Sequence, residues 1–204
     1  MQMARPRNAA RTRAAILAAV KDRFTNEIYD QVGVRQIAAD AGVDAALICR
    51  YFGSKEQLFA TVVAESGRAP MEILSGTRED FGVRAARALF DPSHRSHKES
   101  LDFINLAMRS TMSSFAREQV QQHIERRFVI PFSTWLGERG AAEKAWLVAS
   151  VLMGVSAMRG IVSGADCPAD RQETFIQHLA RTLQAIVDKG STQAERVTGR
   201  ESFG

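Results

Sequence analysis

The side chains best suited to chemistry lie close together in the first quarter of the sequence. Arg50 can form two hydrogen bonds to the edge of a guanine or grip a phosphate, and Tyr51 and Lys55 are ordinary phosphate donors. Ala45 and Ala46 carry only methyl groups, which contact thymine methyls or allow the backbone to approach closely. These residue types indicate a protein surface that binds nucleic acid mainly through its phosphates and contacts few base edges directly.

Two short helices joined by a tight turn would position these side chains. Ile37, Ala38 and Ala41 recur at helical spacing, Gly42 can adopt the left-handed conformation that ends a helix, and Asp44 is a good N-cap for the next helix. The pattern predicts a helix-turn-helix whose second helix enters a major groove. Double-stranded DNA is therefore the first partner to consider.

The second helix of this motif would run from Asp44 to Phe52. Its spacing predicts that one face is buried through Leu47, Ile48 and Phe52, and that the other face carries Ala45, Ala46, Cys49 and Arg50. A thiol on the DNA-facing side could act as a redox or electrophile switch. An unreactive thiol is the favoured reading, because only the helix N-terminus would lower its pKa.

Three segments between Thr12 and Val62 follow the sequence pattern of a known protein family, with the same spacing. Phe24 comes at the end of the first predicted helix, residues 37–43 read IAADAGV, and residues 51–58 read YFGSKEQL. The segment resembles the DNA-binding domain of the TetR family of bacterial transcriptional regulators. The resemblance implies a helix-turn-helix domain of three helices, then a helical body that binds a ligand and dimerises, with a fourth helix linking the two.

The resemblance also assigns roles on the DNA surface, with base contacts for the two alanines and Arg50 and phosphate contacts for Cys49, Tyr51 and Lys55. Three positions depart from the family pattern, and the first is Ile28, where Gly is usual. Cys49 stands where Tyr or His is usual, and Gly33 replaces a Ser or Thr that normally touches a phosphate, although free backbone N–H groups there could still face an anion. The predicted DNA-binding residues are Arg35, Asp44, Ala45, Ala46, Cys49, Arg50, Tyr51 and Lys55.

Charge and composition limit the other possibilities. The 204 residues carry a net charge of +4, and the start of the chain as far as Lys21 holds five cations and no acid, which suits an arm near phosphates or an ordinary solvated terminus. The two cysteines, Cys49 and Cys167, have no CxxC partner and predict a reduced, cytoplasmic setting. The apolar run 145–158 is shorter than the roughly 20 residues of a membrane span, and no signal peptide is visible.

The rest of the chain reads as helices, and Pro131 should kink or split one of them. We therefore predict an all-α fold, with a helix-turn-helix DNA-binding domain and basic arm in residues 1–54. A helical ligand-binding and dimerisation body would occupy residues 55–188, and residues 189–204 would form a disordered tail.

Two late helices have the pattern of an interface. The helix near residues 145–162 is apolar nearly all round, and the last helix places apolar side chains at steps of three and four residues. Paired and repeated by a two-fold axis, they would form a homodimer, the arrangement that the resemblance also implies. The alternative is that both only fill the core of one chain. The candidate interface residues are Val151, Val155, Ile176, Leu179, Leu183 and Ile186.

The body is rich in aromatic and methionine side chains that could line a cavity for a small apolar or amphipathic effector. Each of them, taken singly, is more readily explained as core. Arg159 interrupts an apolar helix and needs a carboxylate or an anionic ligand as its partner. The candidate pocket residues are Phe103, Met108, Met112, Phe115, Phe132, Trp135 and Arg159.

Other chemistry finds little support in the sequence. His94 and His97 form an H-x-x-H pair without a third ligand, and a solvated loop explains them better than a metal site. The sequence has no G-x-S-x-G, P-loop, dinucleotide fingerprint or H-E-x-x-H motif, so we predict neither an enzyme nor a cofactor. We predict a repressor that an effector releases from a near-palindromic operator. The alternative is a ligand-independent or architectural DNA-binding protein without a pocket.

Overall fold

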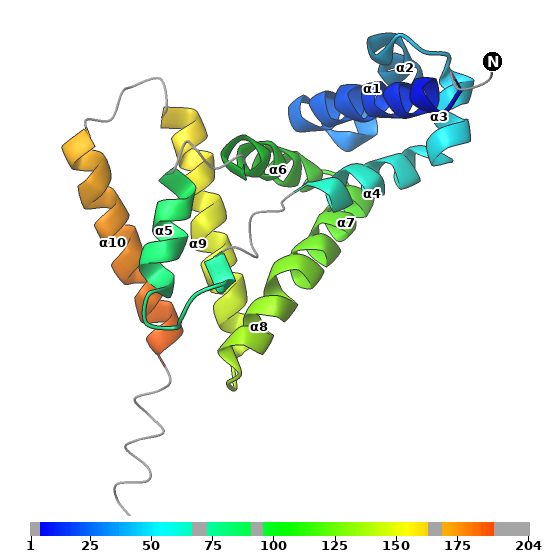
Figure 1. Ribbon diagram of the computed structural model, residues 1–204. Coiled ribbons are helices and arrows are strands. Elements are labelled where there is room, and N and C mark those ends of the chain that lie inside the picture. Colours follow the sequence, from blue (N-terminus) through cyan, green and yellow to red (C-terminus); the bar gives the residue numbers. More distant parts are fainter. Residues whose placement is uncertain (1–4, 67–72, 91–95, 163–168, 190–204) are drawn as a thin grey trace, which may run out of the picture. The chain divides into compact units, whose positions relative to one another are not determined.

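The computed structural model describes residues 5–66, 73–90, 96–162 and 169–189 (Figure 1). Every regular element in these ranges is helical, so the all-α prediction is confirmed. The described helices are α1 (Arg5–Asn26), α2 (Val34–Ala41), α3 (Ala45–Phe52), α4 (Lys55–Glu65), α5 (Phe81–Phe90), α6 (Ser96–Ser110), α7 (Ser114–Ile124), α8 (Ile130–Leu136), α9 (Ala141–Val162) and α10 (Ala169–Asp188). A short 3₁₀ turn, η1, spans Tyr29–Gln31.

The contacts divide the chain into two compact units. Unit 1 comprises residues 1–68 and 99–124, and unit 2 comprises residues 69–98 and 125–204. This division differs from the predicted boundary after residue 54, because the contacts group α4, α7 and most of α6 with the first three helices. The predicted division into functional domains stays a proposal.

Unit 1 is built around an apolar core that α1, α2, α3 and α4 share. Ile16, Val20, Ile37 and Leu58 are each completely buried. The rings of Phe24 and Phe59 pack edge to face with their centres 4.9 Å apart, and two polar contacts join α6 to α1, namely Lys21 with Asp102 at 2.9 Å and Arg109 with the Thr25 carbonyl oxygen at 2.9 Å.

Unit 2 is centred on the close packing of α5 against α10. Gly82 makes this approach possible, since a Cβ atom there would lie 2.2 Å from the Ala180 carbonyl oxygen and 2.8 Å from the Gln184 Cβ. Phe81 is completely buried, and its ring centre lies 5.5 Å from that of Phe132 and 5.3 Å from that of Trp135.

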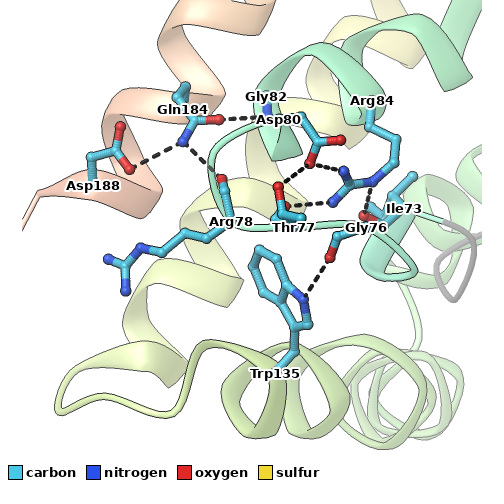
Figure 2. A network of polar contacts seen from close by, with 10 residues as sticks. All are labelled: Ile73, Gly76, Thr77, Arg78, Asp80, Gly82, Arg84, Trp135, Gln184 and Asp188. Carbon is cyan, nitrogen blue, oxygen red and sulfur yellow. Dashed lines mark hydrogen bonds and ion pairs between the residues drawn. The ribbon is translucent and has the colours of Figure 1, made fainter.

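Gln184 on α10 fixes the segment that leads into α5 (Figure 2). Its amide nitrogen donates to the Arg78 carbonyl oxygen at 2.9 Å, and its amide oxygen accepts from the Gly82 N–H at 2.9 Å. Within the same segment, Arg84 pairs with Asp80 and donates to the Ile73 carbonyl oxygen at 3.0 Å. One half-buried side chain therefore forms hydrogen bonds with two backbone groups near the start of α5.

The C-terminus of α10 is capped by two cations. The Arg78 guanidinium and the Lys144 ammonium both donate to the Val187 carbonyl oxygen, at 2.6 and 2.7 Å, where the helix dipole favours positive charge. Both cations also pair with Glu138. Burial alone would raise the pKa of the Glu138 carboxyl, but its hydrogen bonds with Lys144 and Arg78 outweigh burial and hold the pKa below its ordinary value.

The helix that the sequence predicts around Pro131 is interrupted in the structure. A π-helical turn at Glu125–Val129 separates α7 from α8, and Pro131 lies in the first turn of α8. Proline has no N–H to donate to the carbonyl four residues earlier, and the wider turn changes the hydrogen-bond register at this point.

The candidate interface residues separate into two groups. Ile176, Leu179 and Leu183 are buried inside unit 2, with Leu183 completely covered, whereas Val151, Val155 and Ile186 are half-buried. The α10 positions that were predicted as a seam between two chains thus already contribute to the core of one chain. On α9, by contrast, Leu147 is 51% exposed and Met158 is 56% exposed.

Helix α9 is also longer than the apolar run 145–158. The segment Ala141–Met158 is long and apolar enough to cross a membrane by length and composition, and 28% of it is buried in the structure. Core helices of soluble proteins meet the same criterion. The side chains of Arg159, His94 and His97 and the tail from residue 190 lie outside the described residues.

Gly82→Ala should destabilise unit 2 by about 1–3 kcal/mol, because the added methyl group meets the backbone of α10. Urea unfolding followed by circular dichroism measures this change. The neighbouring Val83 is 50% exposed, and Val83→Ala serves as a control that should stay within about 0.5 kcal/mol of the wild type. Equal stabilities for the two variants would contradict the close packing.

Candidate nucleic-acid interface

The turn between α2 and α3 has the geometry that the sequence predicts. Gly42 lies in the left-handed region with φ 64°, and its N–H donates to the carbonyl oxygens at the end of α2. The Asp44 carboxylate then accepts the N–H of Ala46 at 2.7 Å and caps α3. An eight-residue helix is marginal by itself, so its direction depends on this cap and on the side chains it buries.

Helix α3 buries one face and presents the other to solvent. Ile48 is 1% exposed and Phe52 8% exposed, while Leu47, predicted as buried, is half-buried. The solvent-facing positions include three that are exposed, Ala46, Cys49 and Arg50, and two that are half-buried, Ala45 and Tyr51. The groups nearest to an approaching duplex would therefore be the Arg50 guanidinium, the Cys49 thiol and the Ala46 methyl group.

At the start of α2, one expected anion-facing group is already engaged. The Gly33 N–H donates to the Gln36 side-chain oxygen at 2.7 Å, so the free donor expected at this position is occupied within the chain. Arg35, in the first turn of α2, is exposed and can reach a phosphate near the helix start.

The start of α4 holds Lys55, another of the predicted phosphate contacts. Ser54 caps the helix and exchanges hydrogen bonds with Gln57, at 3.3 and 3.1 Å. Lys55 follows, half-buried, with its ammonium nitrogen 4.2 Å from the centre of the Tyr29 ring. Burial lowers the pKa of Lys55, although the nearby carboxylates of Asp30 and Glu56 act in the opposite direction.

Two residues that the sequence analysis did not select border this surface. Tyr29 lies under Lys55, and Arg13 of α1 places its guanidinium 5.2 Å from the centre of the Phe52 ring and 3.5 Å from Glu65. Arg13 belongs to the basic start of the chain. The charge of that segment predicts a role near phosphates, but it does not predict where each side chain lies. No spacing rule connects Tyr29 with Lys55, because the two side chains meet only through the fold.

A salt-bridge cluster holds α2 against α1. Arg23 donates to both carboxylate oxygens of Asp40 and also to Glu27 at 2.6 Å. The hydrogen bonds from Arg23 keep the pKa of Asp40 below its ordinary value. The cluster therefore links α2 directly to α1.

The candidate effector residues fall into different units. Phe103, Met108, Met112 and Phe115 belong to unit 1, whereas Phe132 and Trp135 belong to unit 2. Met108 is 58% exposed and Met112 71% exposed, while Phe132 is completely buried among other rings. Trp135 is half-buried and donates its indole N–H to the Gly76 carbonyl oxygen at 3.3 Å (Figure 2). The six side chains therefore do not gather within either unit.

Two protein families match the sequence. Residues 16–62 match the family described as "Bacterial regulatory proteins, tetR family", and residues 79–187 match "Tetracyclin repressor-like, C-terminal domain". The HTH-type transcriptional repressor Rv3405c of Mycobacterium tuberculosis is 34% identical over 87 residues, which cover 38% of this chain and 46% of the repressor. The chain thus spans about half the length of that relative.

Solved structures resemble almost the whole chain. A TetR-family regulator (SCO0857) from Streptomyces coelicolor has a TM-score of 0.52 at 26% identity, covering 88% of this chain and 96% of that protein. NalD, the secondary repressor of the MexAB-OprM multidrug efflux pump in Pseudomonas aeruginosa, has a TM-score of 0.62 at 16% identity, covering 86% and 96%. The second likeness concerns the fold alone.

Asp44→Ala should destabilise the protein by about 0.5–2 kcal/mol, because the N–H of Ala46 loses its acceptor. Asp44→Ser keeps a capping oxygen and should retain most of the stability. Thermal and urea unfolding compare the two. A cap role is contradicted when both variants are equally destabilised, and a Ser variant that is stable but binds DNA weakly would assign the carboxylate a contact of its own.

Proposed function

Because the chain belongs to the TetR family of bacterial regulatory proteins, we propose that it is a transcriptional repressor that binds a near-palindromic operator as a homodimer. Members of this family are DNA-binding regulators rather than enzymes, and the resemblance recognised in the sequence is confirmed. The repressor would act in the cytoplasm and leave its operator when a small apolar or amphipathic effector binds. The observation that carries the proposal is the solvent-facing side of α3, capped by Asp44 and bearing Arg50.

Direct reading of bases rests mainly on Arg50. Its side chain is exposed on α3, and a guanidinium can form paired hydrogen bonds with guanine. Ala45 and Ala46 add only methyl contacts, while Arg35, Cys49, Tyr51 and Lys55 would contact the phosphate backbone. We therefore expect modest base specificity per half-site, which two half-sites would multiply.

The homodimer is proposed to form through the exposed apolar face of α9. Leu147 and Met158 lie three helical turns apart on the same side, with half-buried Val151 and Val155 between them. A second copy of the chain would cover this face and supply the second recognition helix. On α10, the half-buried Ile186 remains a candidate contact, whereas the buried leucines act from within the core.

The effector is proposed to be apolar or amphipathic because aromatic and methionine side chains are the candidate contacts. Exposed Met108 and Met112 are adaptable surfaces for such a molecule. An effector lowers DNA affinity only by the amount that it prefers the non-binding state, typically about 1–3 kcal/mol. Release should therefore be partial even at saturating effector, and DNA should weaken effector binding by the same factor.

Selection of bound fragments from a random duplex pool tests the function directly. A repressor of this kind should enrich a near-palindrome, and failure to enrich any sequence would overturn the proposal. A panel of apolar and amphipathic small molecules should then release the enriched duplex and change the fluorescence of Trp135 and Trp146. A panel that changes neither would leave the alternative, a ligand-independent DNA-binding protein.

Arg50→Ala should weaken binding to the enriched duplex by about 1–3 kcal/mol and change binding to a mixed-sequence duplex much less. Lys55→Ala should weaken binding to both duplexes alike, because a phosphate contact carries no sequence information. Titrations on the two duplexes separate these roles. Equal losses for Arg50→Ala on both duplexes would assign Arg50 to a phosphate.

Leu147→Glu combined with Met158→Glu should convert the dimer to a folded monomer, because both side chains are exposed on one chain and two carboxylates would be buried in the interface. Sedimentation measures the change. Val83→Glu, at a similarly exposed position on α5, is the matched control and should remain dimeric. A double variant that stays dimeric would exclude this face of α9.

A further inference from the structure

We propose that Tyr29 is a positioning residue that holds Lys55 in place for its phosphate contact, an inference that rests on the proposed DNA-binding function. The ammonium nitrogen of Lys55 lies 4.2 Å from the centre of the Tyr29 ring, well within the range of a cation–π interaction. Tyr29 belongs to η1, between α1 and α2, whereas Lys55 begins α4. The contact therefore joins a residue of the linker between α1 and α2 to a residue that we propose binds DNA.

The ring is a fixed platform. Tyr29 is 6% exposed, and its ring centre lies 5.6 Å from that of Phe24, 4.9 Å from that of Phe59 and 5.4 Å from that of Phe115. Its hydroxyl donates to the Glu56 carboxylate at 3.3 Å. Because neighbours on several sides hold the ring, Lys55 adapts to Tyr29 and not the reverse.

The two carboxylates near Lys55 are engaged with other donors. Asp30 accepts the Ser113 hydroxyl at 3.3 Å, and Glu56 accepts the Tyr29 hydroxyl. In the part of the chain that the structure describes, Lys55 forms no ion pair within 4 Å. A cation–π contact uses the charge of the ammonium and leaves N–H donors available for a phosphate oxygen.

The ring should raise DNA affinity in two ways. It restricts a flexible side chain before DNA arrives, which reduces the entropy lost on binding. It also removes part of the water around the ammonium, in line with the lowered pKa of Lys55, so less dehydration remains when a phosphate binds. We expect loss of the ring to weaken DNA binding about three-fold to ten-fold, the size of a modest cation–π contribution.

A double-variant cycle on a short mixed-sequence duplex tests the inference without knowledge of the operator. Tyr29→Leu removes the ring face and should weaken binding, whereas Tyr29→Phe keeps the face, loses only the hydroxyl and should bind nearly as the wild type does. In the Lys55→Ala background, Tyr29→Leu should have no further effect. The slope of log affinity against log salt should fall by up to about 0.9 for Tyr29→Leu, as for the loss of one phosphate contact.

A second pair of variants guards against misfolding. Tyr29→pentafluorophenylalanine keeps the shape of Tyr29→Phe but reverses the charge distribution of the ring, so it should bind DNA more weakly than Tyr29→Phe at equal thermal stability. Unlike affinity, the salt slope does not depend on the fraction of folded protein. A loss that tracks stability alone would assign Tyr29 a purely structural role.

Two outcomes overturn the inference while leaving the proposed function intact. The first is an equal loss for Tyr29→Leu in the wild-type and Lys55→Ala backgrounds, because the ring would then act without Lys55. The second is tighter binding by Tyr29→Leu, because the ring would then keep Lys55 away from DNA. A wild-type protein that binds no duplex would instead refute the proposed function, and this inference with it.

Discussion

The packing of four aromatic rings in unit 1 is the interaction on which its proposed DNA-binding surface depends. Phe24, Tyr29, Phe59 and Phe115 come from α1, η1, α4 and α7, and each ring centre lies within about 6 Å of at least one other. The rings fix α4 relative to the linker before α2. Because α2 and α3 are only eight residues each, their direction is set by this core and by their caps.

Unit 2 depends on a different constraint, the absence of a side chain at Gly82. Close approach of α5 to α10 lets Gln184 bond to backbone groups at the start of α5, and it brings Leu183 into the core. The same packing buries Leu179 and Leu183 of α10 inside unit 2. The exposed side of α9, which carries Leu147 and Met158, is the surface that we propose for the partner chain.

The sequence predicts the fold best where the structure depends on interactions within a few residues of the chain. Gly42 and Asp44 stop and start helices through their own backbone and side chain, so the turn could be predicted without any tertiary contact. Pro131 broke a helix for an equally local reason. The exposure of Ala46, Cys49 and Arg50 also follows from periodicity.

The sequence by itself determined the helical class, the helix-turn-helix and which residues of its second helix face solvent, because caps and periodicity act within a few residues. Only the tertiary structure decided which apolar side chains remain exposed and which cations already contact other groups of the chain. Leu179 and Leu183 have the same spacing whether they face a second chain or α5, and only their burial separates the two cases. Likewise, the ring under Lys55 comes from Tyr29, 26 positions away, and no local rule reaches across that distance.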